Sequence, residues 1–363
     1  MLANFAQEIK PRLPHWRQAE SLIWLVAGLP MAVLALLLLA LLWAAPAHAA
    51  DETVCAGQNL LPGLEREQPN RYATMLAEAE ATPNGKSRFW KIEKSGLAPS
   101  WLLGTMHVTD PRVLTLSDAA RKASSEADVI VIESDEILDE KKAAAALMMQ
   151  PELTMFTDGT TISDRLTPEE KVKLEAGLKE RGIPLAAVNR MKPWIIASVV
   201  AMPACEMARK ATGASFLDKK LAEDAKAAGK RVAGLETLAE QIGAMADLPL
   251  EFHLKALIET LALNEEMDDI IETMTELYLT GDIGMTMPML EAVTPEAGSE
   301  KDSGYAAFEK RIVLDRNKVM AERSAPLLAD GNAFIAVGAL HLPGEEGLVE
   351  LLRKQGFSVS AVD

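Results

Sequence analysis

Short apolar runs alternate with helical patterns along most of the chain. The runs expected to form strands are residues 89–92, 101–104, 128–133, 231–234, 334–337 and 357–362. The first two flank a turn at Ser95-Gly96, which predicts a β-hairpin. The third run, Asp-Val-Ile-Val-Ile-Glu, has only apolar residues between its two acids and predicts a buried strand.

Apolar residues at helical spacing dominate the rest of the chain. The segments expected to be helical are 116–125, 167–182, 216–228, 249–280, 305–328 and 348–352. Thr167-Pro-Glu-Glu170 is a typical helix start, with a threonine cap, a proline at the first helical position and acids in the first turn. No low-complexity linker divides these elements. We therefore expect one α/β or α+β domain over residues 50–363, in which many helices surround a central, mostly buried mixed β-sheet.

The first 49 residues have the pattern of an export signal. Lys10, Arg12 and Arg17 precede an almost uncharged stretch at 21–45, and Ala47-His48-Ala49 resembles a cleavage site. This pattern predicts a cleaved signal peptide and a periplasmic protein. The apolar stretch is also long enough to span a bilayer, so an uncleaved inner-membrane anchor with a periplasmic domain is the alternative. In that case the N-terminal segment alone would contact the membrane.

Charge and cysteine content narrow the possible partners and compartment. The whole chain carries a formal charge of −16, and the part after residue 49 keeps 34 basic and 51 acidic residues, a balance of −17. Nucleic acid is a poor partner for such a chain. The two cysteines, Cys55 and Cys205, both follow the export signal. In an oxidising compartment we expect them to form a disulfide, and the alternative is two separate thiols.

One local pattern occurs twice. Gly104-Thr-Met-His107 and Gly338-Ala-Leu-His341 each follow an apolar run, and the chain has only five histidines. Glycine permits a sharp exit from a strand, and ligands of open α/β sheets gather at the carboxyl ends of strands. This duplicated strand and Gly-x-x-His unit predicts that both histidines converge on one site. His253 has no such setting, and we expect it to be a packed or surface helical residue.

Two glutamates follow predicted strands. Glu133 ends the run at 128–133, where an isolated carboxylate would be costly unless a metal ion or a basic residue satisfies it. Glu236 follows the run at 231–234 and precedes a helix. It is either a second site carboxylate or an acid that stabilises a helix N-terminus.

Three further polar residues are candidates with ordinary structural alternatives. Glu345 lies four residues after His341, where it is either a general base, a partner of a site residue or part of a helix start. Arg316 and Asn317 lie inside a helical pattern, where core packing or helix pairing is the more usual role of such residues.

Five strings resemble, in order, the motifs of the TraB/GumN family. They are Trp101-Leu-Leu-Gly-Thr-Met-His-Val108, Val131-Ile-Glu-Ser-Asp135, Gly234-Leu-Glu-Thr-Leu-Ala-Glu-Gln241, Asp315-Arg-Asn-Lys-Val-Met320 and Val337-Gly-Ala-Leu-His-Leu-Pro-Gly-Glu345. That family is similar to the ectodomain metalloproteases that inactivate Wnt proteins, which carry paired Gly-x-x-His motifs and a Glu, and more distantly to erythromycin esterase-like hydrolases. The resemblance implies that His107, His341 and Glu133 are metal-site positions. It implies supporting roles for Glu236, Arg316, Asn317 and Glu345.

These observations lead to two hypotheses of different class. The first is an extracytoplasmic metal-dependent hydrolase, a peptidase being one form, in which a divalent ion such as Zn or Mn activates water. Glu345 or Glu236 would accept the proton, and Arg316 would stabilise the oxyanion. The second is a periplasmic binding or sequestering protein that holds a peptide, haem or another ligand without turnover. A purely structural role for both histidines is the weakest reading because their settings match.

Overall fold

The computed structural model describes residues 55–263, 266–293 and 304–362, all of which belong to one compact unit, Thr53–Asp363. The expected export signal at 1–49 lies outside these residues. Within the described ranges, every helix is too short or too polar to cross a bilayer.

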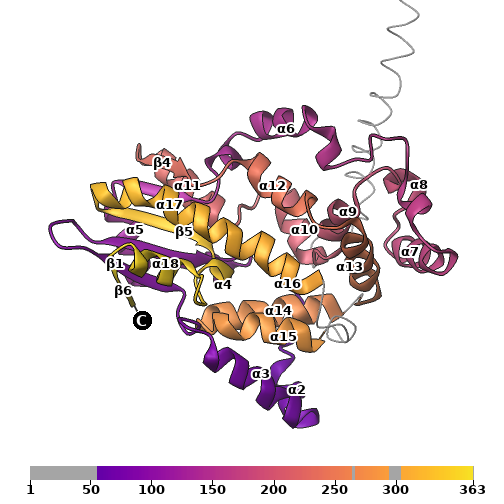
Figure 1. Ribbon diagram of the computed structural model, residues 1–363, viewed down its shortest axis with the longest axis horizontal. Helices are drawn as coiled ribbons and strands as arrows, with labels where there is room; N and C mark the ends of the chain where they lie inside the picture. Colours follow the sequence, from indigo (N-terminus) through magenta and orange to yellow (C-terminus); the bar gives the residue numbers. More distant parts are fainter. Residues whose placement is uncertain (1–54, 264–265, 294–303, 363) are drawn as a thin grey trace, which may run out of the picture. The chain divides into compact units, whose positions relative to one another are not determined.

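A six-stranded mixed sheet forms the centre of the molecule (Figure 1). Its strand order is β4 (Arg231–Gly234), β3 (Val129–Ile132), β5 (Ala333–Gly338), β2 (Ser100–Thr105), β1 (Phe89–Glu93) and β6 (Ser358–Ala361). Neighbours from β4 to β2 are parallel, whereas β1 is antiparallel to both β2 and β6. The expected mixed sheet and the hairpin of its first two strands are confirmed.

The register brings the two Gly-x-x-His segments to one edge. β2 and β5 are parallel neighbours, and Thr105 pairs with Gly338. Both histidines therefore follow strands that leave the sheet side by side. Because β1 is antiparallel to β2, with Phe89 opposite Leu103, the start of β1 lies at this same edge. The sequence after β2, β3 and β5 and the sequence before β1 thus meet in one region.

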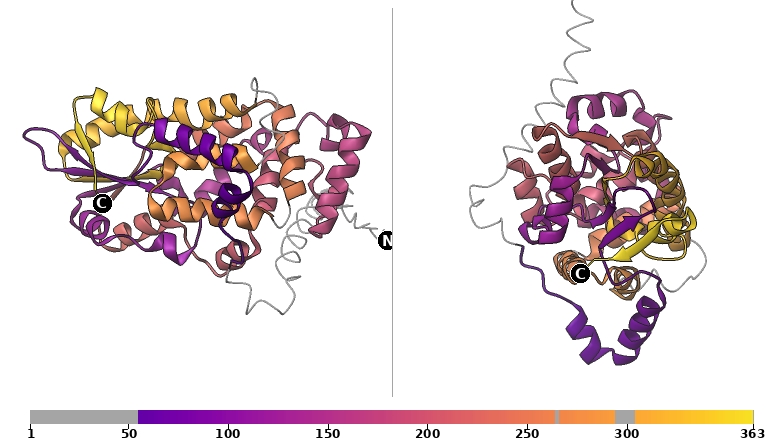
Figure 2. Two further views of the ribbon diagram at one scale, coloured as in Figure 1. Left: turned by 90° about the horizontal axis from the view of Figure 1, so that it is seen from below. Right: turned by 90° about the vertical axis from the view of Figure 1, so that its left-hand side faces the viewer.

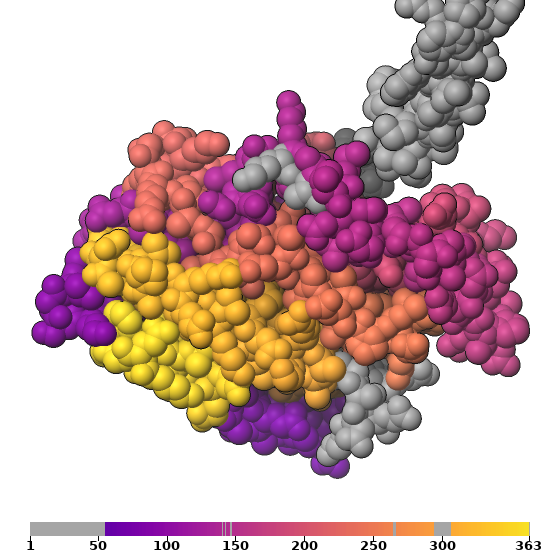
Figure 3. All heavy atoms as spheres, turned by 45° about the horizontal axis from the view of Figure 1, so that its top comes forward, coloured from indigo at the N-terminus to yellow at the C-terminus, as the bar shows by residue number. Residues whose placement is uncertain are grey.

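Alternating side chains bury both faces of the sheet. Ile130 and Ile132 pack with α5 (Asp118–Glu126) and α11 (Leu217–Ala227). Val129 and Val131 pack on the other face with α17 (Asp315–Asp330) and α18 (Leu348–Lys354). Figure 2 shows helices on both sides of the sheet, and in Figure 3 the yellow and light-orange C-terminal segments form one continuous surface. A strand buried on both faces explains why β3 is uniformly apolar.

Two helical groups have cores of their own. One core joins α7 (Pro168–Glu180), α9 (Pro193–Val200) and α13 (Leu250–Leu263). The other joins α3 (Pro69–Ala81), α14 (Glu266–Thr280) and α15 (Thr286–Val293). Thr167 caps α7 and forms the capping box with Glu170 that its sequence predicts.

Shorter elements complete the fold. The α-helices are α2 (Leu61–Glu67), α4 (Pro111–Leu114), α6 (Glu140–Met148), α8 (Leu185–Val188), α10 (Ala204–Ala211), α12 (Leu238–Ala246) and α16 (Gly304–Phe308). The 3-10 turns are η1 (Asp135–Leu138), η2 (Pro151–Leu153), η3 (Ile162–Arg165), η4 (Ile283–Met285) and η6 (Ala339–His341). A disulfide joins Cys55 to Cys205 in α10, as expected.

Two long helical predictions differ from the structure. The segment predicted as one helix at 249–280 contains two helices, α13 and α14. The segment predicted at 305–328 contains a π-helical turn, η5 (Glu309–Leu314), between α16 and α17. The spacing of apolar residues does not predict a π turn. Its one extra residue only changes the direction in which the side chains after it point from the helix. Those residues include Arg316 and Asn317.

Candidate metal centre

A cavity of about 290 Å³ opens at the carboxyl edge of the sheet. Its wall includes His107 after β2, Glu133 after β3 and His341 after β5. Arg316, in the first turn of α17, lines the same cavity. The structure thus brings together four of the residues singled out from the sequence.

His341 is buried and held by an amide. Its Nδ1 lies 2.7 Å from Oδ1 of Asn317, whose Nδ2 donates to the carbonyl of Glu346 at 2.9 Å. This orientation of the amide makes Nδ1 the protonated nitrogen and leaves a lone pair on Nε2. Burial lowers the pKa of His341 to about 4, although the charge of Glu133 opposes this shift. The ring is therefore neutral at neutral pH.

His107 lies in a different environment. Its side chain is 56% exposed, and its Nε2 lies 3.5 Å from Oδ2 of Asp218. The ring also meets Phe216 edge to face, with ring centroids 5.0 Å apart. Loss of hydration would lower the pKa of His107, but the negative charges of Asp218 and Glu133 raise it to about 9.

Glu133 is the common neighbour of the two histidines. Its Oε1 accepts a hydrogen bond from the Gly338 amide at 2.7 Å and lies 3.8 Å from Nε2 of His341. Its Oε2 accepts from Gln241 at 2.8 Å. Burial favours the neutral acid, but the charges of His341, His107 and Arg316 lower the pKa of Glu133 to about 2. The carboxylate stays ionised and fixed in place.

Arg316 joins two buried glutamates. Its Nη2 donates to Glu133 at 2.6 Å and to Glu236 at 2.7 Å, and its Nε donates to both oxygens of Glu236 at 3.1 Å. Glu236 is turned toward this arginine, and its backbone amide donates to the Glu133 carbonyl at 2.7 Å. Arg316 and Glu236 thus orient the carboxylate that both histidines approach.

The donor set fits a divalent cation. Ligand atoms of His107, Glu133 and Asp218 all lie within 4.8 Å of one another. Asp218 is 2% exposed, and its Oδ1 accepts from the Thr105 hydroxyl at 2.8 Å. Its Oδ2 is buried, accepts no hydrogen bond from a described residue and lies 3.5 Å from Nε2 of His107, so it needs a cation beside it, either the protonated ring of His107 or a bound metal ion. Imidazole and carboxylate are ligands that Zn and Mn accept.

Three predicted residues do not line this cavity: Glu236, which is bound to Arg316, and also Glu345 and Asn317. The side chain of Glu345 is exposed and lines a separate cavity beside Glu346. The chain turns through Pro343 and Gly344 after His341, so closeness in sequence does not carry Glu345 to the histidines. Asn317 is fully buried behind His341 and contacts the ring instead of the cavity.

Sequence reasoning missed Asp218, Gln241 and Tyr278 as members of this region. Asp218 stands in the first turn of α11, where an acid is ordinary because it favours the helix dipole. Gln241 belongs to one of the family-like strings and bonds Glu133. Tyr278 lines the cavity from α14 and donates to the Gly104 carbonyl at 3.0 Å. No local pattern in the sequence marks the tyrosine.

Comparisons with known proteins identify the family of the chain. The model of the TraB/PrgY/gumN family matches residues 88–361. Metalloprotease TIKI1 of Danio rerio is 24% identical over 319 residues, which cover 75% of this chain and 62% of that protein. The TIKI homolog of Nematostella vectensis is 23% identical over 332 residues (78% and 69%), and human TIKI1 is 24% identical over 343 residues (80% and 65%). No solved structure gives a significant match.

Proposed function

The chain belongs to the TraB/PrgY/gumN family, and from this premise we propose that it is an extracytoplasmic metal-dependent hydrolase with peptides as candidate substrates. The observation that carries the proposal is the cluster of His107, Glu133 and Asp218 within 4.8 Å, with His341 beside Glu133. Similarity to proteins named metalloproteases supports the reaction class.

The proposed ligands are His107, Glu133 and His341, with Asp218 as an added candidate. Bound to them, a divalent ion such as Zn or Mn would polarise a carbonyl and lower the pKa of water. His341 presents its Nε2 lone pair because Asn317 takes the other ring proton. Arg316 and Gln241 hold Oε2 of Glu133 in place, and Oε1 lies 3.8 Å from Nε2 of His341.

The proton acceptor is assigned from the same geometry. Glu345 is exposed outside the cavity wall, and Glu236 is engaged by Arg316. Asp218 is the carboxylate with a free buried oxygen beside His107. We therefore assign proton acceptance to Oδ2 of Asp218 in the case where Asp218 is not itself a ligand, and assign Arg316 to holding Glu133.

The location outside the cytoplasm rests on two features. A disulfide between Cys55 and Cys205 is typical of oxidising compartments. The sequence before it has the pattern of an export signal, with a membrane anchor as the alternative.

The test compares metal content and hydrolysis in wild type, His107→Ala and His341→Ala. Protein is loaded with Zn or Mn, separated from free ion and analysed by mass spectrometry, then assayed on a quenched fluorogenic peptide library. We expect about one ion per wild-type chain and loss of both metal and cleavage in the variants. His253→Gln is the matched control, because His253 bonds the Met245 carbonyl away from the site. Unchanged metal content in both alanine variants would refute the proposal, and metal binding without cleavage of any peptide would favour a sequestering role.

A further inference from the structure

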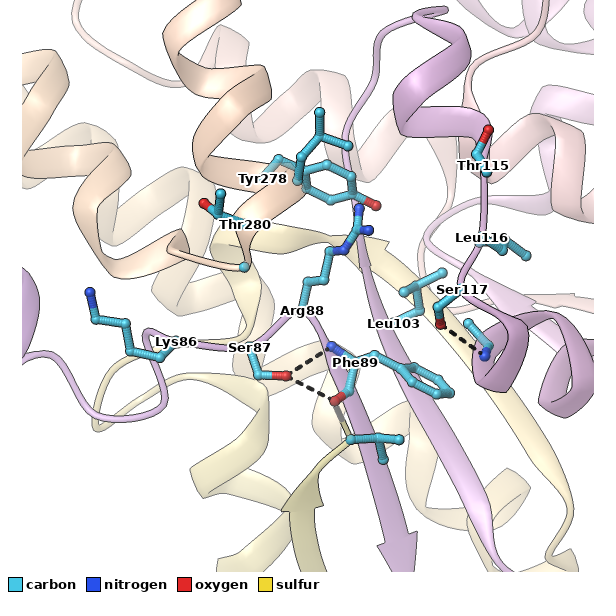
Figure 4. A pocket seen from close by; sticks show the side chains of 14 residues that line it. Lys86, Ser87, Arg88, Phe89, Leu103, Thr115, Leu116, Ser117, Tyr278 and Thr280 are labelled. Atoms are coloured by element: carbon cyan, nitrogen blue, oxygen red, sulfur yellow. Dashed lines mark hydrogen bonds between the residues drawn. The ribbon is translucent and has the colours of Figure 1, made fainter. Parts of the chain in front are cut away.

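A second cavity, of about 200 Å³, lies at the same edge of the sheet (Figure 4). Lys86 and Arg88 enter it from the segment before β1, and Ser117 enters it from the cap of α5. Phe89, Leu103 and Leu116 supply apolar walls. Two basic residues and no acidic residue line this cavity, although the chain carries 53 acids against 37 bases. The charged side chains of this lining are therefore all positive.

Arg88 is the cation available to a ligand. Among the residues that the structure describes, no carboxylate forms an ion pair with it. Its guanidinium lies over the ring of Tyr278, 4.4 Å from the centroid, and Figure 4 shows the two side chains together. Burial raises the pKa of Tyr278 to about 12, so the phenol stays neutral and does not offset this charge. Lys86, by contrast, is paired with Asp282 at 2.8 Å.

The cavity adjoins the candidate metal centre. Tyr278 lines both cavities, and its hydroxyl donates to the Gly104 carbonyl. The Gly104 amide donates to the Arg88 carbonyl at 2.7 Å. Gly104 opens the segment that ends in His107, so Arg88 is fixed to the strand that carries one proposed ligand. Tyr278 is therefore a wall that the metal centre and the Arg88 cavity share.

We propose that the Arg88 cavity binds a carboxylate group of a peptide that occupies the neighbouring centre. A guanidinium that no described carboxylate neutralises matches a single negative charge, and its planar fork can bind a carboxylate through two hydrogen bonds. The apolar walls fit the aliphatic stem beside such a group. The peptide as substrate rests on the proposed function, but the preference for a carboxylate does not require catalysis.

The experiment measures binding to metal-free protein, so turnover cannot interfere. Dansylated alanine-based octapeptides carry one glutamate, moved through the positions, and each is compared with its glutamine counterpart. A second set compares the free C-terminal acid with the amide. We expect the best carboxylate peptide to bind about tenfold more tightly than its neutral partner, since a charged hydrogen bond is worth about 1.5–3 kcal/mol. The set that shows the effect identifies a side-chain or a terminal carboxylate.

Variants assign the preference to Arg88. Arg88→Gln should reduce the ratio of the two affinities, carboxylate peptide over neutral peptide, to about one. Arg88→Lys should leave an intermediate ratio, because lysine keeps the charge but lacks the planar fork of the guanidinium. Arg121→Gln is the matched control, since Arg121 is exposed on α5 and pairs with Asp118 outside the cavity. The absence of a preference in wild type, or an equal preference in Arg88→Gln, would overturn the inference. A protein that keeps the preference but cleaves nothing would refute the hydrolase and leave the carboxylate site standing.

Discussion

The two Gly-x-x-His segments share a sequence pattern and follow neighbouring strands, yet their histidines lie in opposite environments. The side chain of His341 is 7% exposed and held by Asn317, whereas the side chain of His107 is 56% exposed and faces Asp218. Burial lowers the pKa of one ring to about 4, and nearby carboxylates raise the pKa of the other to about 9. The motif sets where the backbone leaves the sheet, and the neighbouring helices set the charge of the ring.

The two segments are also anchored by different parts of the molecule. Both carboxylate oxygens of Glu206 accept the Thr109 amide, at 3.0 and 2.9 Å, two residues after His107. Glu206 follows Cys205, which is tied to Cys55. His341 depends instead on α17 through Asn317. A cation would therefore be held between one rigid, neutral ring and one exposed ring that must first lose a proton.

Glu133→Ala should have the largest effect, because it removes the residue that both histidines share. It leaves Arg316 with one of its two buried carboxylates and the Gly338 amide without an acceptor. We expect a loss of about 3–5 kcal/mol in the free energy of unfolding, measured by urea denaturation. Glu345→Ala, at an exposed position, should change it by less than about 0.5 kcal/mol. Similar losses of unfolding free energy in the two variants would show that Glu133 does not hold the two histidine segments together.

Replacing Cys55 and Cys205 together by serine should affect the segment that contains His107 and leave the segment that contains His341 unchanged. The disulfide closes a sequence separation of 150 residues, and its loss should cost about 2–5 kcal/mol. Hydrogen exchange should rise at residues 107–110, whose anchor follows Cys205, and remain unchanged at 339–342. Glu206→Gln should reproduce the local change with the disulfide intact. Equal loss of protection in both segments would show that they are not anchored independently.

Asn317→Leu should act on the other segment. It leaves the buried Nδ1 of His341 and the part-buried Glu346 carbonyl without the amide that bonds them. We expect about 1–3 kcal/mol of destabilisation. Metal affinity, measured by calorimetry with Mn, should weaken about tenfold or more. Ser324→Ala is the control, because Ser324 is buried on the same helix and bonds only the Met320 carbonyl. If both variants bind Mn equally, Asn317 does not orient the ring.

The sequence predicted where the site residues lie in the fold better than it predicted the burial and charge around them. Alternation and apolar runs predict strands, and parallel strands place their ends at one edge, so His107, Glu133 and His341 could be grouped before the structure was known. Asp218 could not, because an acid in a first helical turn is ordinary, and only the packing of α11 beside β3 brings it to His107. Glu345 shows the opposite error. It lies only four residues after His341 in the sequence, yet its side chain lines a separate cavity.

Arg316 illustrates a limit of periodicity. A cation in a helical pattern is usually a solvated or packed residue, and the π-helical turn before it leaves no signature in the apolar spacing. The long-range bonds from Arg316 to Glu133 and Glu236, separated by 183 and 80 residues, exist only in the folded chain. The family-like string around Arg316 was the one signal that marked it.

Asp218→Asn should give the smallest effect and the most specific one. In metal-free protein, NMR titration should place the pKa of His107 near about 9, and the substitution should move it toward the ordinary value of 6.5. His341 should stay neutral over this range in both proteins.

Because the folded-state pKa of His107 is raised, the stability that the protonated ring contributes is complete below pH 6.5 and is lost as the pH rises through about 9. The slope of unfolding free energy should be shallow, since the side chain is largely exposed, and it should be flat in Asp218→Asn. A His107 that titrates near 6.5 in wild type would mean that the two rings differ in burial but not in charge.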